Sequence, residues 1–123
     1  KQALDEFRFV ITNYPLSEEA KQAREKILQC EEKLAEYTLQ IGKLYYKMKA
    51  YKGSTARLIE LLSNYPNYSK MERVYFYLGD SYYRWRKIDE AIPYFTKLIS
   101  DFPKSKYAKK AIKRMKEIEK KKK

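Results

Sequence analysis

The side chains that most often carry out acid–base, nucleophilic or metal chemistry are nearly absent from this sequence. There is no histidine, which removes the commonest general base and the commonest metal ligand. The one cysteine, Cys30, can form neither an internal disulfide nor a zinc site, and we expect it to be a buried small hydrophobe. The carboxylates are scattered among lysines, and no glycine-rich phosphate-binding motif occurs. We therefore predict a protein that is not an enzyme and uses no cofactor or metal.

Tyrosine, lysine and arginine supply the remaining chemistry, which is that of binding. The chain has 13 tyrosines. Aromatic and arginine side chains anchor protein interfaces, and arginine and lysine pair with carboxylates. The pair Tyr45-Tyr46 followed by a lysine recurs as Tyr82-Tyr83 followed by an arginine. We expect most tyrosines to pack inside the fold, with Tyr46 and Tyr83 as the exceptions.

Most of the positive charge lies at one end of the chain. The net charge is +12, and Lys104–Lys123 alone holds 11 basic and 2 acidic residues, a net of +9. We expect this segment to be a solvated, partly frayed cap, with contact to anionic headgroups or an acidic partner as the alternative. No basic stripe runs through the rest of the chain, so we do not predict nucleic-acid binding. No run of 18 apolar residues occurs.

Three segments of the chain repeat one pattern, and each ends in a proline, at Pro15, Pro66 and Pro103. Small and apolar residues precede each proline at matching distances, as they would on one face of a short helix. The aligned residues are Ala3, Ser54 and Ala91 at 12 positions before the proline, Phe7, Leu58 and Phe95 at 8, Val10, Leu61 and Leu98 at 5, and Ile11, Leu62 and Ile99 at 4.

The last copy resembles a tetratricopeptide repeat (TPR), because residues 72–105 carry that motif's residues at its offsets: Tyr75, Leu78, Gly79, Tyr82, Ala91, Phe95 and Pro103. We predict an all-α TPR solenoid in which Ala91 packs against Gly79 and Phe95 is largely buried. Asp89 is the expected N-cap of the second helix of this repeat, which would put Pro93 in the first helical turn.

The uneven spacing of the repeats predicts one long helix between the first two. Residues 17–49 contain no proline and only Gly42, and Ser17 is a plausible N-cap. Their apolar residues form a continuous helical stripe: Ala20, Ala23, Ile27, Cys30, Leu34, Tyr37, Ile41, Leu44 and Met48. We expect six helices, near residues 1–13, 17–49, 52–64, 70–86, 89–101 and 104–119.

We interpret residues 1–123 as a single TPR domain. Residues 1–15 would be the second half of a truncated repeat, and residues 16–69 the long helix plus the second repeat. Residues 70–105 would be the third repeat, and residues 106–123 a basic capping helix and tail. The chain would then be a fragment of a longer protein whose upstream repeats precede it.

A more specific resemblance lies in the long helix and the segment after it. Leu34-Ala35-Glu36-Tyr37, Tyr45-Tyr46-Lys47, Ala50-Tyr51 and Asn64-Tyr65-Pro66 resemble the BamD family, lipoproteins of the outer-membrane β-barrel assembly machinery. The resemblance covers about residues 3–107. One departure is Gly53-Ser54, where the family usually has two alanines, and we expect the following helix to begin less firmly.

The BamD resemblance implies a non-catalytic scaffold on the periplasmic face of the bacterial outer membrane. Its partners would be the barrel-insertion component and accessory lipoproteins, with no nucleic acid and no small-molecule substrate. A lipid anchor outside this fragment would hold it to the membrane. The last repeat also resembles periplasmic TPR partners of the Tol system, so a generic periplasmic TPR adaptor is the alternative, followed by a nucleic-acid-associated helical protein.

The TPR resemblance also suggests which side chains line the concave face. We predict partner binding by two groups, of which Phe76 and Tyr83 are expected to be exposed. The first group is Lys43, Tyr46 and Lys47, with Glu36 and Leu39 beside them. The second group is Arg73, Phe76, Asp80, Tyr83 and Arg84.

Overall fold

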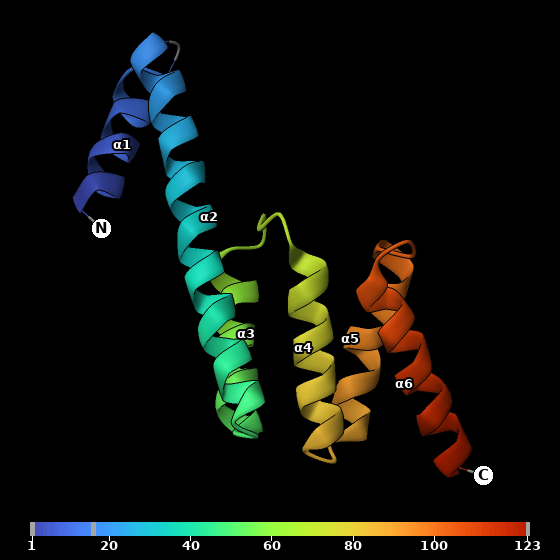
Figure 1. Cartoon of the computed structure of the whole chain (residues 1–123). Helices are drawn as coiled ribbons and strands as arrows, with labels where there is room; N and C mark the ends of the chain where they lie inside the picture. The colour runs from blue at the N-terminus through green and yellow to red at the C-terminus, as the bar shows by residue number, and fades with distance from the viewer. Residues whose placement is uncertain (1, 16, 123) are drawn as a thin grey trace. The chain divides into compact units, whose positions relative to one another are not determined.

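The computed structural model describes residues 2–15 and 17–122, with the side chains of residues 3–15 and 17–121. Within these ranges it contains helices and no strand (Figure 1), which confirms the predicted all-α fold. The helices are α1 (Gln2–Asn13), α2 (Glu18–Lys47), α3 (Tyr51–Asn64), α4 (Met71–Arg84), α5 (Ile88–Asp101) and α6 (Lys106–Lys122). The helix start predicted at residue 1 and the end of the predicted tail at residue 123 lie outside the described residues. The chain divides into two compact units, Lys1–Glu36 and Tyr37–Lys123.

The first unit contains α1 and the first part of α2. Ser17 caps α2 as predicted, because its Oγ accepts the backbone amide of Ala20 at 2.9 Å. The guanidinium of Arg24 donates from both terminal nitrogens to the carbonyl of Pro15, at 3.3 Å each. Ala20 and Ala23 are buried, so small residues form the packed face of this end of α2. Cys30 is free and half-buried.

The long helix is confirmed, since α2 runs unbroken from Glu18 to Lys47. The predicted apolar stripe is wrong in its second half, where Tyr37, Leu44 and Met48 are exposed. Leu39 and Gly42 are buried there instead. The reason is the fit of α3, because Leu58 packs directly over Gly42 and turns the Gly42 face of α2 inward. The predicted stripe also includes Leu34, which is exposed as well.

Two glycines of the second unit each receive a large side chain from the next helix. A Cβ added to Gly42 would lie 2.7 Å from the side chain of Leu58, and one added to Gly79 would lie 2.8 Å from the ring of Phe95. Leu58 and Phe95 are both fully buried, which confirms the prediction for Phe95. The three atoms nearest to a Cβ added at Gly79 all belong to Phe95, and the contact of Ala91 with Gly79 stays a prediction.

Ser54 firmly anchors the start of α3, contrary to our expectation. It is fully buried, and its hydroxyl donates to the carbonyl of Gly42 at 2.9 Å. It also lies 3.0 Å from the hydroxyl of Ser81. Ser54 therefore links α3 to both α2 and α4 with satisfied hydrogen bonds, which a buried alanine could not supply.

Helix α5 begins earlier than predicted. Its cap is Lys87 and not Asp89, so Pro93 is the sixth helical residue and lies beyond the first turn. Proline lacks the amide that would bond the carbonyl four residues earlier, here that of Asp89. Both Pro93 and Asp89 are exposed, so water can reach this position.

Helix α6 packs against α4 and α5. The sequence predicts a capping helix here, and Lys106–Lys122 is helical. The expectation that this helix is solvated is wrong for one face, which is buried. Its apolar side chains alternate with the lysines at helical spacing and form a buried face. The buried residues of α6 are Tyr107, Ala108, Ala111 and Ile118.

Candidate functional site

A polar cavity of about 370 Å³ lies among α2, α4 and α6 in the second unit. It collects side chains from three segments that are far apart in the sequence. Its lining residues are Tyr46, Phe76, Tyr77, Asp80, Arg84, Lys110, Lys113, Arg114 and Glu117. Four of the predicted binding residues, Tyr46, Phe76, Asp80 and Arg84, are among them.

Asp80 is the centre of a hydrogen-bonded group that we call the inner cluster: Tyr46, Asp80 and Arg84. The Asp80 side chain is fully buried. It accepts the hydroxyl of Tyr46 at 2.5 Å and Nε of Arg84 at 2.9 Å. Arg114 reaches in from α6 and donates its Nε to the other carboxylate oxygen at 2.6 Å. One buried carboxylate thus connects α2, α4 and α6.

The protonation of this group follows from its surroundings. Burial raises the pKa of Asp80, but hydrogen bonds from Arg114, Tyr46 and Arg84 outweigh burial and hold the pKa below its ordinary value. Burial, followed by the bond to Asp80, raises the pKa of Tyr46 to about 12. At neutral pH, Asp80 is therefore an anion and Tyr46 a neutral donor, with the two arginines as counter-charges.

A second group, the outer cluster, consists of Tyr83, Glu117 and Lys121. Tyr83 donates its hydroxyl to Glu117 at 2.9 Å, and the ammonium of Lys121 lies 5.7 Å from the centre of the Tyr83 ring. Arg114 joins this group too, because its Nη1 donates to Glu117 at 3.1 Å. The hydrogen bond from Tyr83, followed by that from Arg114, lowers the pKa of Glu117.

The outer cluster is the inner cluster displaced by one repeat. Pro66 and Pro103 are 37 residues apart, and adding 37 to each member of the inner cluster gives the corresponding member of the outer cluster. In both, the tyrosine and its carboxylate partner are 34 residues apart. In both, a basic side chain one turn after the carboxylate lies 5.7 Å from the tyrosine ring. Helix α6 therefore occupies the place that α4 has in the preceding repeat.

The cavity has more positive than negative groups. Asp80 and Glu117 are its acidic residues, and the basic ones are Arg84, Lys110, Lys113 and Arg114. Lys113 is exposed. The ammonium of Lys110 lies 5.6 Å from the ring centre of Phe76. This contact with the ring leaves the ammonium able to pair with an anion as well. The arrangement suits the binding of a carboxylate-rich surface. In the part of the chain that the structure describes, no group of three acidic or cysteine side chains could hold a metal ion.

The predicted site residues differ in how deeply they are buried and in which cavity they line. Phe76 and Asp80 are buried, so the expected exposure of Phe76 is wrong: the ring packs against Tyr107 of α6, with ring centres 5.6 Å apart. Leu39 is buried as well. Tyr83 and Arg84 line a smaller neighbouring cavity of about 280 Å³.

The other predicted residues lie outside the first cavity. Lys43 is half-buried with its ammonium 5.6 Å from the centre of the Tyr77 ring, Arg73 is half-buried and Lys47 is exposed. Glu36 belongs to the first unit.

Five lining residues are not among the predicted site residues: Tyr77, Lys110, Lys113, Arg114 and Glu117. Tyr77 lies on α4, and the other four lie on α6, the segment that the sequence predicts to be a solvated cap. A signal for two of them was present, because Glu117 stands 37 residues after Asp80 and Lys110 stands 37 residues after Arg73. The position of Arg114 carried no such signal, since its repeat equivalent is Tyr77 and the two side chains have no chemistry in common.

The comparison with protein families gives one match. The model of the YfiO family, described as an outer membrane lipoprotein, matches residues 1–91. No curated protein matches the chain. Among the described residues, no helix combines the length and the apolar character needed to cross a membrane.

Proposed function

Because this chain belongs to the YfiO family of outer membrane lipoproteins, we propose that it is a non-catalytic scaffold that holds other proteins of the outer-membrane β-barrel assembly machinery. The family match over residues 1–91 is the observation that carries the proposal. The repeated helices support it, because stacked helical repeats build extended surfaces suited to binding other proteins.

The proposed place of action is the periplasmic face of the outer membrane. The proposed partners are the barrel-insertion component of the machinery and its accessory lipoproteins. Membership of an outer membrane lipoprotein family supports this location, and it favours this role over that of a generic periplasmic adaptor.

We propose the cavity among α2, α4 and α6 as the docking site in the second unit. Arg84 and Arg114 are held in place by the buried carboxylate of Asp80, so little side-chain freedom is lost when they meet a partner. Lys110 and Lys113 add positive charge at the same cavity. We propose that a carboxylate-rich part of the partner docks here, and that Lys43, Lys47, Arg73 and Tyr83 extend the contact surface.

Charge reversal at Lys113 tests this site. Lys113 is exposed and lines the cavity, whereas Lys109 is exposed on the same helix and does not line it. We expect Lys113→Glu to reduce capture of the periplasmic repeats of the barrel-insertion component by about tenfold or more. Lys109→Glu, which changes the charge by the same amount, should leave capture nearly unchanged.

Two results would contradict the proposal at different levels. Equal loss in both variants would mean that general charge, and not the cavity, attracts the partner. If the unaltered protein captures none of the barrel-insertion repeats, the proposed assembly role itself is contradicted. Arg84 is a poorer choice for this test, because its ion pair with buried Asp80 would change stability together with binding.

A further inference from the structure

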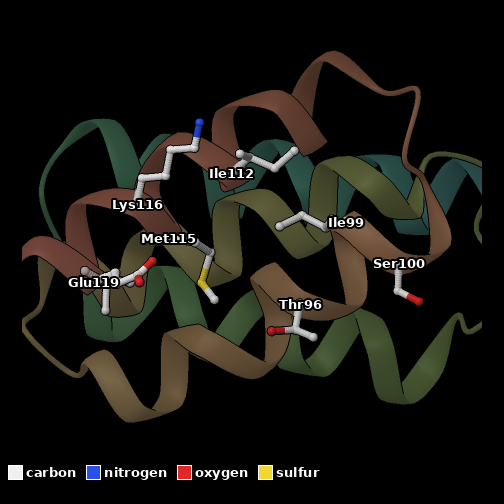
Figure 2. Close-up of a pocket in the computed structure, with 8 residues that line it drawn as sticks. Thr96, Ile99, Ser100, Ile112, Met115, Lys116 and Glu119 are labelled. Carbon is white, nitrogen blue, oxygen red and sulfur yellow. The ribbon is translucent and has the colours of Figure 1, made fainter.

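A small cavity of about 280 Å³ lies at the C-terminal ends of α4 and α6. Tyr83 and Arg84 line it from α4, Arg86 from the turn that follows, Ile88 from α5 and Lys121 from α6. None of these residues is acidic, whereas two carboxylates line the neighbouring polar cavity. The larger groove between α5 and α6 is mainly apolar and carries one lysine and one glutamate (Figure 2). Of these three, the small cavity is the one with basic side chains and no acidic ones.

The preceding repeat shows why this cavity keeps its positive charge. Lys121 stands 37 residues after Arg84. In the inner cluster, Arg84 forms an ion pair with the buried carboxylate of Asp80 at 2.9 Å. In the outer cluster, Glu117 is paired with Arg114 instead, at 3.1 Å. Among the described residues Lys121 forms no ion pair, so its ammonium group can pair with an anion from solution.

The fold holds Arg84 and the backbone of Arg86 in position. Arg84 uses its Nε for the bonds to Asp80 and Tyr46, which leaves its two terminal nitrogens to donate to another acceptor. Arg86 has a left-handed backbone with a φ of 66°, and its amide donates to the carbonyl of Tyr83 at 3.1 Å. The helix dipole favours basic residues at a helix C-terminus, but Arg86 lies beyond the end of α4. Its place in the cavity therefore does not follow from the dipole of α4.

The charge around the cavity indicates which anion it accepts. With the two clusters included, there are four basic residues, Arg84, Arg86, Arg114 and Lys121, and two acidic ones, Asp80 and Glu117, a net charge of +2. A phosphate monoester carries a charge of about −1.5 to −2 at pH 7 and three acceptor oxygens, and arginine and lysine are the side chains that bind it best. We propose that this cavity binds a phosphate group of the monoester type, held by Arg84, Arg86 and Lys121. This binding goes beyond the proposed function, because it needs no partner protein.

Two double variants of the full chain test the proposal. Arg86→Asn with Lys121→Gln removes two charges from the cavity, and asparagine tolerates the left-handed φ of position 86. The matched control is Lys87→Gln with Lys120→Gln, which removes two charges from neighbouring exposed residues that do not line the cavity. Circular dichroism confirms that both double variants are folded.

Two probes distinguish the source of the phosphate. Inorganic phosphate, titrated by calorimetry at low salt, represents a soluble ligand. Phosphatidylcholine vesicles with and without phosphatidic acid, in a sedimentation assay, represent a lipid headgroup. We expect the cavity variant to bind at least one probe about tenfold more weakly than its control. A loss with the vesicles alone assigns the site to a headgroup, a loss with inorganic phosphate alone assigns it to a soluble ligand, and a loss with both assigns it to the phosphate group in either form.

Three results would overturn the proposal. The first is equal affinity of the two double variants for both probes, and the second is no binding of either probe by the unaltered protein. The third is binding of acetate as tight as that of inorganic phosphate at the same ionic strength, because it would assign the cavity to carboxylates. Capture of the barrel-insertion repeats should fall with Lys113→Glu and be the same in the two double variants, so phosphate binding and the proposed function can fail separately.

Discussion

The inner and outer clusters have the same sequence spacing but different surroundings. In each, a tyrosine donates to a carboxylate 34 residues later. The Asp80 side chain is fully buried, whereas that of Glu117 keeps 36% of its surface exposed. Arg114 bonds to both carboxylates. The repeat therefore reproduces the tyrosine–carboxylate hydrogen bond in both clusters. Burial determines whether that hydrogen bond stabilises the fold or remains accessible to a partner.

Removing the buried carboxylate should have the largest effect. Asp80→Ala leaves Arg84, Arg114 and Tyr46 without their common acceptor, and breaking such a buried pair costs about 3–5 kcal/mol of stability. Urea denaturation followed by circular dichroism measures the loss. If the variant does not fold, Asp80→Asn, which keeps an acceptor oxygen, should give a smaller but measurable loss.

The matched change in the outer cluster is Glu117→Ala. Because the Glu117 side chain is partly exposed, whereas that of Asp80 is fully buried, we expect a much smaller change in the free energy of unfolding than for Asp80→Ala. Similar losses in the two variants would mean that burial does not separate the clusters as we describe.

Loss of the Tyr46 hydroxyl should destabilise the fold more than loss of the Tyr83 hydroxyl. Tyr46→Phe removes a hydroxyl that donates to the buried carboxylate of Asp80, and we expect it to cost about 1.5–3 kcal/mol. Tyr83→Phe removes the equivalent donor to Glu117 and should cost clearly less. Thermal or urea unfolding of both variants checks the order, and a larger loss for Tyr83→Phe would reverse our assignment.

Acid should remove the contribution of Asp80. Its folded pKa lies below the ordinary value of 3.8, so its stabilisation is complete above that pH and is lost as the pH falls through the folded pKa. We expect the unfolding free energy of the wild type to fall more between pH 5 and pH 3 (roughly the start and end of carboxylate titration) than that of Asp80→Asn. Parallel curves for the two proteins would contradict this role.

The fold could be predicted from the sequence because its signals are local and repeated. The three prolines and the apolar residues before them set the register, and the absence of glycine or proline between Ser17 and Ile41 predicted an unbroken α2. The exposed face of α2 could not be predicted, because Leu44 and Leu39 are equally apolar. The fit of Leu58 over Gly42 decides between them, and that is a tertiary contact.

The site was predicted less well than the fold. Tyr46 and Arg84 do line the cavity, but the concave face of a repeat array is open only where no later helix covers it. Helix α6 covers Phe76 through Tyr107 and brings Arg114 to Asp80. Its lysine-rich composition indicated a solvated segment, whereas its four buried residues make it part of the core.

The affinity of the barrel-insertion repeats for three forms of the full chain tests the central claim most directly: the wild type, Glu117→Ala and Lys113→Glu. Calorimetric titration measures each affinity, and urea denaturation confirms that all three forms are folded. Glu117→Ala removes a negative charge from the cavity, and Lys113→Glu replaces a positive one. The account predicts the tightest binding for Glu117→Ala, intermediate binding for the wild type and the weakest for Lys113→Glu. Three equal affinities, or the reverse order, would contradict a carboxylate-binding surface built on this cavity.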